Sequence, residues 1–232
     1  MTRTLPTLSM VVILLAGCGG ATSTEGLSDA LLTVGDLSGD WTENRGDPSS
    51  PDGTIPASGS IPEDKRELLP TIEICDAAAA TGKAAADSIE WEYFRQFDMT
   101  PVDPFDPPSD REGHKIFLQE FMLSDGSSDL EQLTADLFPA MEACLGDIPA
   151  GEEGPGMAST IEIGVVGDES LAVLTQIEEA GGRGQWFIYN AIVRKGSVLL
   201  SVVLGDVFIG NLRPEMDLED FDTIVQSAVA KL

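Results

Sequence analysis

Positively charged side chains are scarce in this sequence. Its 232 residues include 13 Lys and Arg against 40 Asp and Glu, which gives a formal net charge of −27. A chain of this charge is repelled by the phosphate backbone of DNA and RNA, and we therefore exclude nucleic acid as a partner. The same charge is typical of a solvated, self-repelling protein, and it leaves open the binding of cations or of a basic partner.

Histidine and recognisable catalytic motifs are equally scarce. His114 is the one histidine, and no nucleophile stands at a fixed spacing from it. The nucleophile motif G-x-S-x-G and the glycine-rich phosphate loops are missing. We therefore interpret His114 as a surface or strand-edge residue, and we expect a protein that is not an enzyme, with no catalytic residues and no cofactor.

No apolar run is long enough to cross a bilayer, which takes about 20 residues. The stretch from Leu8 to Ala16 follows a charged tip with Arg3, the pattern of a secretion signal. It ends in Leu15-Ala-Gly-Cys18, which resembles the lipobox of bacterial lipoproteins, where the cysteine thiol receives a diacylglyceryl group and the signal is cut before it. The alternative is an ordinary secretory signal in which Cys18 is incidental.

The lipobox resemblance implies an address on the extracytoplasmic side of the cell membrane. Residues 1–17 would be a cleaved lipoprotein signal peptide, and residues 18–26 a lipidated, small and polar tether. The acyl chains must supply the anchoring, because no basic patch near Cys18 could add attraction to anionic lipid.

With Cys18 committed to lipid, Cys75 and Cys144 remain as an even pair. In an oxidising compartment a disulfide between them is the expected state, and the alternative is two buried free thiols. Closing a loop of 68 residues would stabilise the fold by ~4 kcal/mol. Neither cysteine has a second cysteine or a histidine at metal-ligand spacing.

Alternating apolar and polar residues predict six extended segments. These are Ser88–Phe97, His114–Leu123, Ser159–Val166, Ser170–Glu178, Gln185–Lys195 and Ser197–Leu204. Glycine-containing breaks between the last three segments favour antiparallel hairpins. Val198 to Leu204 is apolar on both faces, which predicts a central strand.

Apolar residues at helical spacing predict four helices. They cover Leu27 to about Gly35, Asp76–Asp87, a segment from an N-cap at Ser128 to Cys144, and Asp217–Leu232 with Asp217 as N-cap. Pro139 should kink or split the third helix. The sequence therefore predicts one α+β domain over residues 27–232, an antiparallel sheet of about six strands flanked by helices.

Carboxylates in one proline-rich segment raise the question of a metal site. Asp98, Asp103, Asp106 and Asp110 could offer the oxygen ligands that Ca²⁺ prefers, but they lack the order of an EF-hand loop. We therefore interpret them as solvated charge, as we do Glu90 and Glu92 on the polar face of the first long strand, and we expect no metal site.

Four features in sequence order resemble a known group of proteins. They are the lipobox at Cys18, the Leu31-Leu-Thr-Val-Gly-Asp-Leu37 segment before Trp41, the widely spaced Cys75 and Cys144, and Val165-Val-Gly-Asp-Glu-Ser170 before Ile192-Val-Arg-Lys-Gly196. Together they are similar to actinobacterial lipoproteins related to the extracellular sensor domain of mycobacterial PknH-type kinases. Asp40 between Gly39 and Trp41, Lys195 in place of an arginine, and the lack of cysteines for a second disulfide depart from that pattern. The resemblance implies an antiparallel sheet with a ligand cleft and no catalytic residues.

Three functions are compatible with these observations. The first is a tethered binding or sensing module for a small molecule, a lipid or an envelope protein. The second is an envelope lipid carrier with a hydrophobic cavity. The third is a hydrolase that uses two carboxylates ~5–9.5 Å apart, a distance that the sequence cannot place.

Overall fold

The computed structural model describes residues 27–44, 58–60, 75–99, 114–124, 129–148, 154–178, 184–209 and 214–232. The strands are β1 (Trp41–Glu43), β2 (Ser58–Ser60), β3 (Tyr93–Met99), β4 (His114–Ser124), β5 (Gly146–Ile148), β6 (Gly156–Thr160), β7 (Glu169–Glu178), β8 (Gly184–Lys195) and β9 (Val198–Ile209). The helices are α1 (Leu27–Ala30), the 3₁₀ turn η2 (Val34–Asp36), α2 (Ala80–Asp87), α3 (Asp129–Glu142) and α4 (Leu218–Lys231).

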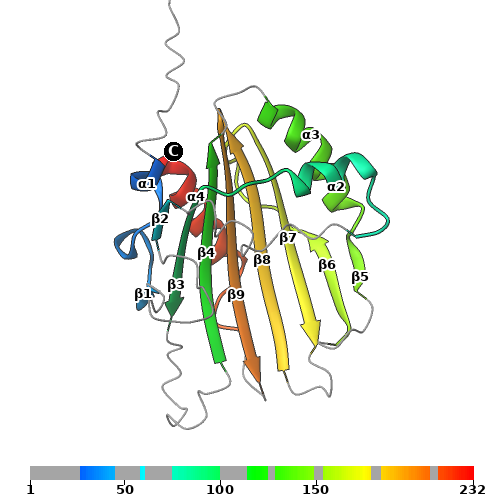
Figure 1. Ribbon diagram of the computed structural model, residues 1–232. Helices are drawn as coiled ribbons and strands as arrows, with labels where there is room; N and C mark the ends of the chain where they lie inside the picture. The colour runs from blue at the N-terminus through cyan, green and yellow to red at the C-terminus, as the bar shows by residue number, and fades with distance from the viewer. Residues whose placement is uncertain are drawn as a thin grey trace, which may run out of the picture.

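The nine strands found in the described residues all belong to one antiparallel sheet (Figure 1). Their order is β1-β3-β4-β9-β8-β7-β6-β5, and β2 also pairs with β3. Helix α4 packs on one face, and α2 and α3 pack on the other. The predicted α+β class and antiparallel pairing are confirmed.

The predicted number of strands is too small by three. The additional strands β1, β2 and β5 have three residues each, too few for an alternating pattern to show in the sequence. The prediction for Ser159–Val166 is also wrong in part, because β6 ends at Thr160. Beyond it the chain leaves the sheet for α4, where the Gly164 N–H donates to Asp222 Oδ1 at 2.7 Å.

Each face of the sheet carries its own hydrophobic core. On the α4 face, Phe221 and Val225 pack with Leu200 of β9. On the opposite face, Leu137 of α3 packs with Leu199 of the same strand. Strand β9 is therefore buried on both sides between β4 and β8, which confirms the central position predicted for Val198 to Leu204.

Helices α2 and α3 form a closely packed pair beside the disulfide. A Cβ on Gly82 would lie 2.0 Å from the Ala140 Cβ, so only glycine permits this approach. Cys75, just before α2, and Cys144, just after α3, form the disulfide expected from the sequence, with a Cα–Cα distance of 5.4 Å. Helix α3 runs through Pro139 and is not split there. Pro139 has no N–H, so the carbonyl of Ala135, four residues earlier, lacks its helical hydrogen bond. Ala135 is exposed, and water can donate to this carbonyl instead.

Different structural elements meet at the two ends of the sheet. At the end that holds Tyr93, Ser124 and Lys195, which we call the proximal end, the Lys195 ammonium donates to the Val229 carbonyl near the end of α4. Lys231 of α4 pairs with Asp36 of η2 at 2.7 Å, so α1, η2 and the end of α4 lie together (Figure 1). Strands β8 and β9 have 12 residues each and span roughly 35–40 Å to the opposite, distal end.

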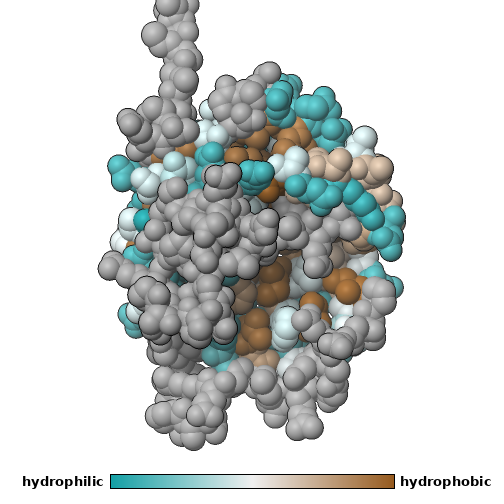
Figure 2. All heavy atoms as spheres, in the orientation of Figure 1, coloured by the Kyte–Doolittle hydropathy of each residue, from teal (hydrophilic) through white to brown (hydrophobic). Residues whose placement is uncertain are grey.

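Helices α2 and α3 cover their face of the sheet toward the proximal end. Hydrophobic residues remain visible on the sheet beyond the hydrophilic outer side of α2 (Figure 2). In the described residues no helix has the length and apolar character needed to cross a membrane. Cys18 and the two N-terminal segments assigned from the sequence lie outside these residues.

Candidate functional site

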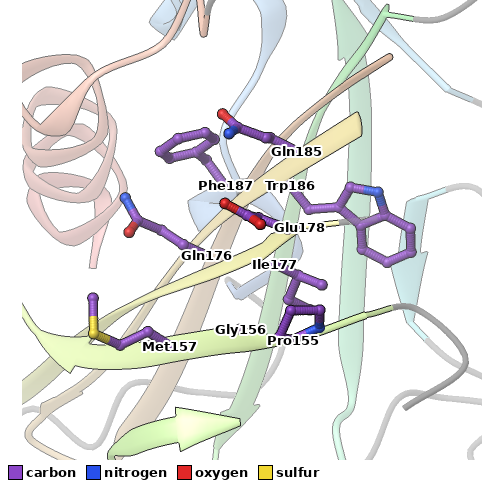
Figure 3. A pocket seen from close by; sticks show the side chains of 9 residues that line it. All are labelled: Pro155, Gly156, Met157, Gln176, Ile177, Glu178, Gln185, Trp186 and Phe187. Carbon is purple, nitrogen blue, oxygen red and sulfur yellow. The ribbon is translucent and has the colours of Figure 1, made fainter. Parts of the chain in front are cut away.

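A pocket opens at the distal end of the sheet, where three neighbouring strands meet (Figure 3). Its volume is about 330 Å³. The start of β6, the end of β7 and the start of β8 form it, and we call it the strand-end pocket. Its lining residues are Pro155, Gly156, Met157, Gln176, Ile177, Glu178, Gln185, Trp186 and Phe187. The volume falls in the range of small-molecule sites, about 300–1,000 Å³.

Strand register decides which lining side chains are neighbours. Met157 is opposite Gln176, which is opposite Phe187, so these three form a row across the strands on the α4 face. Ile177 is opposite Trp186 on the other face. Figure 3 shows the two sets pointing to opposite sides of the strands.

Large apolar side chains at this pocket remain partly open to solvent. Met157 is 49% exposed and Trp186 is half-buried, whereas Trp41 and Trp91 are each 4% exposed in the cores. Exposed apolar side chains that gather around a hollow are typical of a binding site. A methionine at such a place adapts its shape to different apolar ligands.

Gly156 lets β6 approach β7 closely at the pocket. A Cβ at this position would lie 2.6 Å from the Gln176 carbonyl oxygen and 3.1 Å from Ile177 Cγ1. Any other side chain would push the two strands apart. The shape of the pocket therefore depends on this glycine.

A buried His–Asp pair supports the pocket from the α4 side. Phe187 stacks on Phe208 with ring centres 6.0 Å apart, and His114 meets Phe208 edge-on at 5.7 Å. His114 Nε2 lies 2.7 Å from Asp206 Oδ1. Asp206 Oδ2 accepts the N–H groups of Glu215 at 2.7 Å and Met216 at 3.0 Å. This carboxylate therefore ties β4 to the chain that enters α4.

The interpretation of His114 as a surface or strand-edge residue is wrong about its burial. Its side chain is 5% exposed and that of Asp206 is fully buried. The His114–Asp206 pair cannot be recognised from the sequence, because 92 residues separate the two and the predicted strand ends at Leu204, before Asp206. Sheet pairing alone brings them together, since Asp206 is opposite Ile116, two residues after His114.

The carboxylates singled out in the sequence do not gather into a site among the described residues. Asp98 accepts hydrogen bonds from Asn44 Nδ2 at 2.6 Å and Gln96 Nε2 at 3.2 Å. Asp103, Asp106 and Asp110 lie outside the described residues. Glu92 Oε2 accepts the Ser124 N–H at 3.3 Å, and Glu90 is exposed. Within the described ranges no three His, Cys, Asp or Glu side chains meet to hold a metal ion.

A second buried carboxyl contacts the segment that joins α1 to η2. Glu120 of β4 is fully buried, and its Oε2 accepts the Leu32 N–H at 2.7 Å. Arg95 of β3 donates to the Leu32 carbonyl and pairs with Glu43 at 3.6 Å. Burial raises the pKa of Glu120 to about 7, against the lowering effect of the Leu32 N–H and the charge of Arg95. This pair clamps the segment that follows α1.

We expect the pKa of Glu120 to make the protein more stable at acid pH. Because the folded carboxyl holds its proton up to about pH 7 and its ordinary pKa is 4.5, the contribution is full below pH 4.5 and disappears as the pH rises through 7. The difference amounts to about 3 kcal/mol. Urea unfolding between pH 4.5 and 8 should therefore show a fall in the free energy of unfolding that Glu120→Gln reduces by that amount. Equal pH slopes for the two proteins would contradict this assignment.

The lining of the strand-end pocket was not identified from the sequence. A signal was present in the adjacent Trp186 and Phe187. Neighbouring residues of a strand point to opposite faces, so both rings cannot enter the same core. Glu120 also had a signal, since it stands in line with Ile116, Leu118 and Met122 on the buried face of one strand.

Three solved structures are similar to this chain, whereas no family model and no curated protein matches it. The extracellular domain of PknH from Mycobacterium tuberculosis is 15% identical, with a TM-score of 0.46, over 89% of this chain and 94% of that one. An uncharacterised protein from Mycobacterium smegmatis, the Rv0999 ortholog, is 12% identical with a TM-score of 0.43, over 83% of this chain and 87% of that one.

The third similar structure is LpqN of Mycobacterium tuberculosis, described as involved in cell envelope biogenesis. It is 14% identical, with a TM-score of 0.26, over 86% of this chain and 93% of that one. At low sequence identity, the chain is similar to the extracellular domain of the mycobacterial kinase PknH.

Proposed function

We propose that this protein is a non-catalytic binding module of the cell envelope, and that the strand-end pocket holds its small-molecule ligand. The observation that carries the proposal is a hollow of about 330 Å³ at the strand ends, with the half-exposed Met157 on the α4 face and the half-buried Trp186 on the other. Two glutamine amides and one carboxylate add polar contacts that would orient a ligand.

The proposal includes a lipid tether on Cys18 that holds the domain on the extracytoplasmic face of the cell membrane. The sequence motif at Cys18 supports it, and so does the direction of the described chain. Leu27 begins α1 near the proximal end, whereas the pocket lies at the distal end, roughly 35 Å away along the strands. A ligand would then enter from the side that faces away from the tether.

The composition of the pocket favours binding over the two other functions. A hydrolase that uses paired carboxylates needs two of them, and Glu178 is the one carboxylate among the nine lining residues. A lipid carrier needs an apolar cavity, whereas Gln176, Gln185 and Glu178 make a third of this lining polar. A small molecule with an apolar body and a polar group fits both the apolar and the polar residues of this lining.

Native mass spectrometry of the full chain, purified from its own cells in a neutral polyoxyethylene detergent, tests both parts. We expect a bound small molecule in the wild type and an at least tenfold smaller bound fraction after Trp186→Ala, because one wall of the pocket is removed. Met157→Ser, at an exposed position, provides a second variant that disturbs folding less. Val165→Ala, which changes a fully exposed apolar residue outside the pocket, is the matched control.

The same spectra report on the tether. The intact mass should carry a diacylglyceryl group that Cys18→Ala removes, and an unmodified wild type would contradict the anchor. A wild type without a bound molecule, or a bound fraction that Trp186→Ala and Met157→Ser leave unchanged, would contradict the binding site.

A further inference from the structure

We propose that the ligand of the strand-end pocket is an organic cation, an ammonium group carried on an apolar body. This inference rests on the proposed function and adds the charge of the ligand. It depends on which side chains line the pocket and on how the strand register groups them.

Among the nine lining residues, the only charge is negative. Glu178 is the one ionisable residue among the nine, and Gln185 is directly opposite it across the β7–β8 pair. Figure 3 shows the Glu178 side chain in the middle of the lining set. Its backbone N–H donates to the Pro155 carbonyl at 2.9 Å, which fixes β7 against the start of β6. A carboxylate and an amide oxygen side by side can accept the N–H groups of an ammonium.

An aromatic ring stands next to this carboxylate. Phe187 lies two residues beyond Gln185 on the same face, and its ring is held by stacking on Phe208. The face of an aromatic ring attracts a cation within about 6 Å. The row continues with Gln176 and Met157, so an apolar body can extend across the strands from an ammonium held near Glu178.

An anionic ligand would meet no compensating charge among the described residues that line this pocket. No Lys or Arg is among the lining residues. Arg194 and Lys195 lie at the proximal end, where Arg194 pairs with Glu169 at 3.3 Å and Lys195 donates to the Val229 carbonyl. The net charge of −27 also concentrates cations around the molecule and repels anions.

Three probes of one size and different charge test the inference. They are 2-phenylethylamine as the cation, 2-phenylethanol as the neutral analogue and 3-phenylpropionate as the anion. The full chain in a neutral polyoxyethylene detergent is titrated at pH 7, and its backbone amide resonances are followed by NMR. We expect the amide resonances of Gln185 and Phe187 to move and those of Trp41 and Trp91 to stay, because the latter two residues are buried in the cores.

The expected order is a dissociation constant about tenfold lower for the amine than for the alcohol, and no saturable shift with the anion. In Glu178→Gln, the dissociation constant of the amine should lie within about twofold of that of the alcohol, since the carboxylate supplies much of the preference for the amine. Glu178 is exposed, so the substitution should leave the fold intact. Glu131→Gln makes the same change of charge at an exposed site on α3 and should keep the wild-type preference.

The outcomes separate the two proposals. Equal binding of the alcohol, tighter binding of the anion, or an amine preference that survives Glu178→Gln would overturn the cation inference and leave the pocket in place. If none of the three probes moves the Gln185 or Phe187 resonances, the binding site itself is contradicted.

Discussion

Replacing Asp206 by alanine is expected to lower the free energy of unfolding by about 3–5 kcal/mol. The carboxylate is fully buried, and His114 and the N–H groups of Glu215 and Met216 depend on it. Its removal takes away their shared hydrogen-bond acceptor and releases the chain that leads into α4. Urea unfolding at pH 7 followed by circular dichroism measures the effect.

Two further variants test whether the loss of stability comes from the charge of the carboxylate or from its buried position. Asp206→Asn keeps one acceptor oxygen and should lose less stability than Asp206→Ala. Asp87→Ala removes an exposed carboxylate at the end of α2 and should change the free energy of unfolding by no more than about 0.5 kcal/mol. A loss below about 1 kcal/mol for Asp206→Ala would show that the His114–Asp206 pair does not hold this end of the sheet.

The double substitution Cys75→Ser and Cys144→Ser should cost about 4 kcal/mol of unfolding free energy. The disulfide closes a loop that includes α2, β3, β4 and α3, so the unfolded chain gains freedom when it is removed. It also ties the start of the α2–α3 pair to its end. Urea unfolding of wild type and variant gives the difference directly.

Reduction provides the control for this prediction. Dithiothreitol should lower the stability of the wild type to that of the double variant and leave the variant unchanged. An oxidised wild type no more stable than the variant would contradict the stabilising role of the bond.

The elements that were predictable from the sequence carry their signal within a short stretch of chain. Helix α4 shows an apolar stripe, and its N-cap Asp217 accepts the N–H groups of Glu219 at 2.8 Å and Asp220 at 3.1 Å, as predicted. The six longer strands show alternation or continuous apolar character over five or more residues. Strands β1, β2 and β5 are too short for any period to appear.

The candidate site could not be predicted because it depends on strand order and register. The three parts of the strand-end pocket, residues 155–157, 176–178 and 185–187, meet only because β6, β7 and β8 are neighbours in the sheet. Glu120 and Asp206 likewise extend rows of apolar residues, and an acidic residue in such a row was not recognised as buried. Both find their partners across the sheet, at Leu32 and His114.

Hydrogen exchange tests the central claim, a ligand site at the distal end of the sheet, most directly. The full chain is compared with and without the small-molecule fraction released from the protein purified from its own cells. We expect added protection at residues 156–157, 176–178 and 185–187, and none at the proximal end around Lys195 and Leu232. Protection confined to the proximal end, or no change anywhere, would contradict this claim.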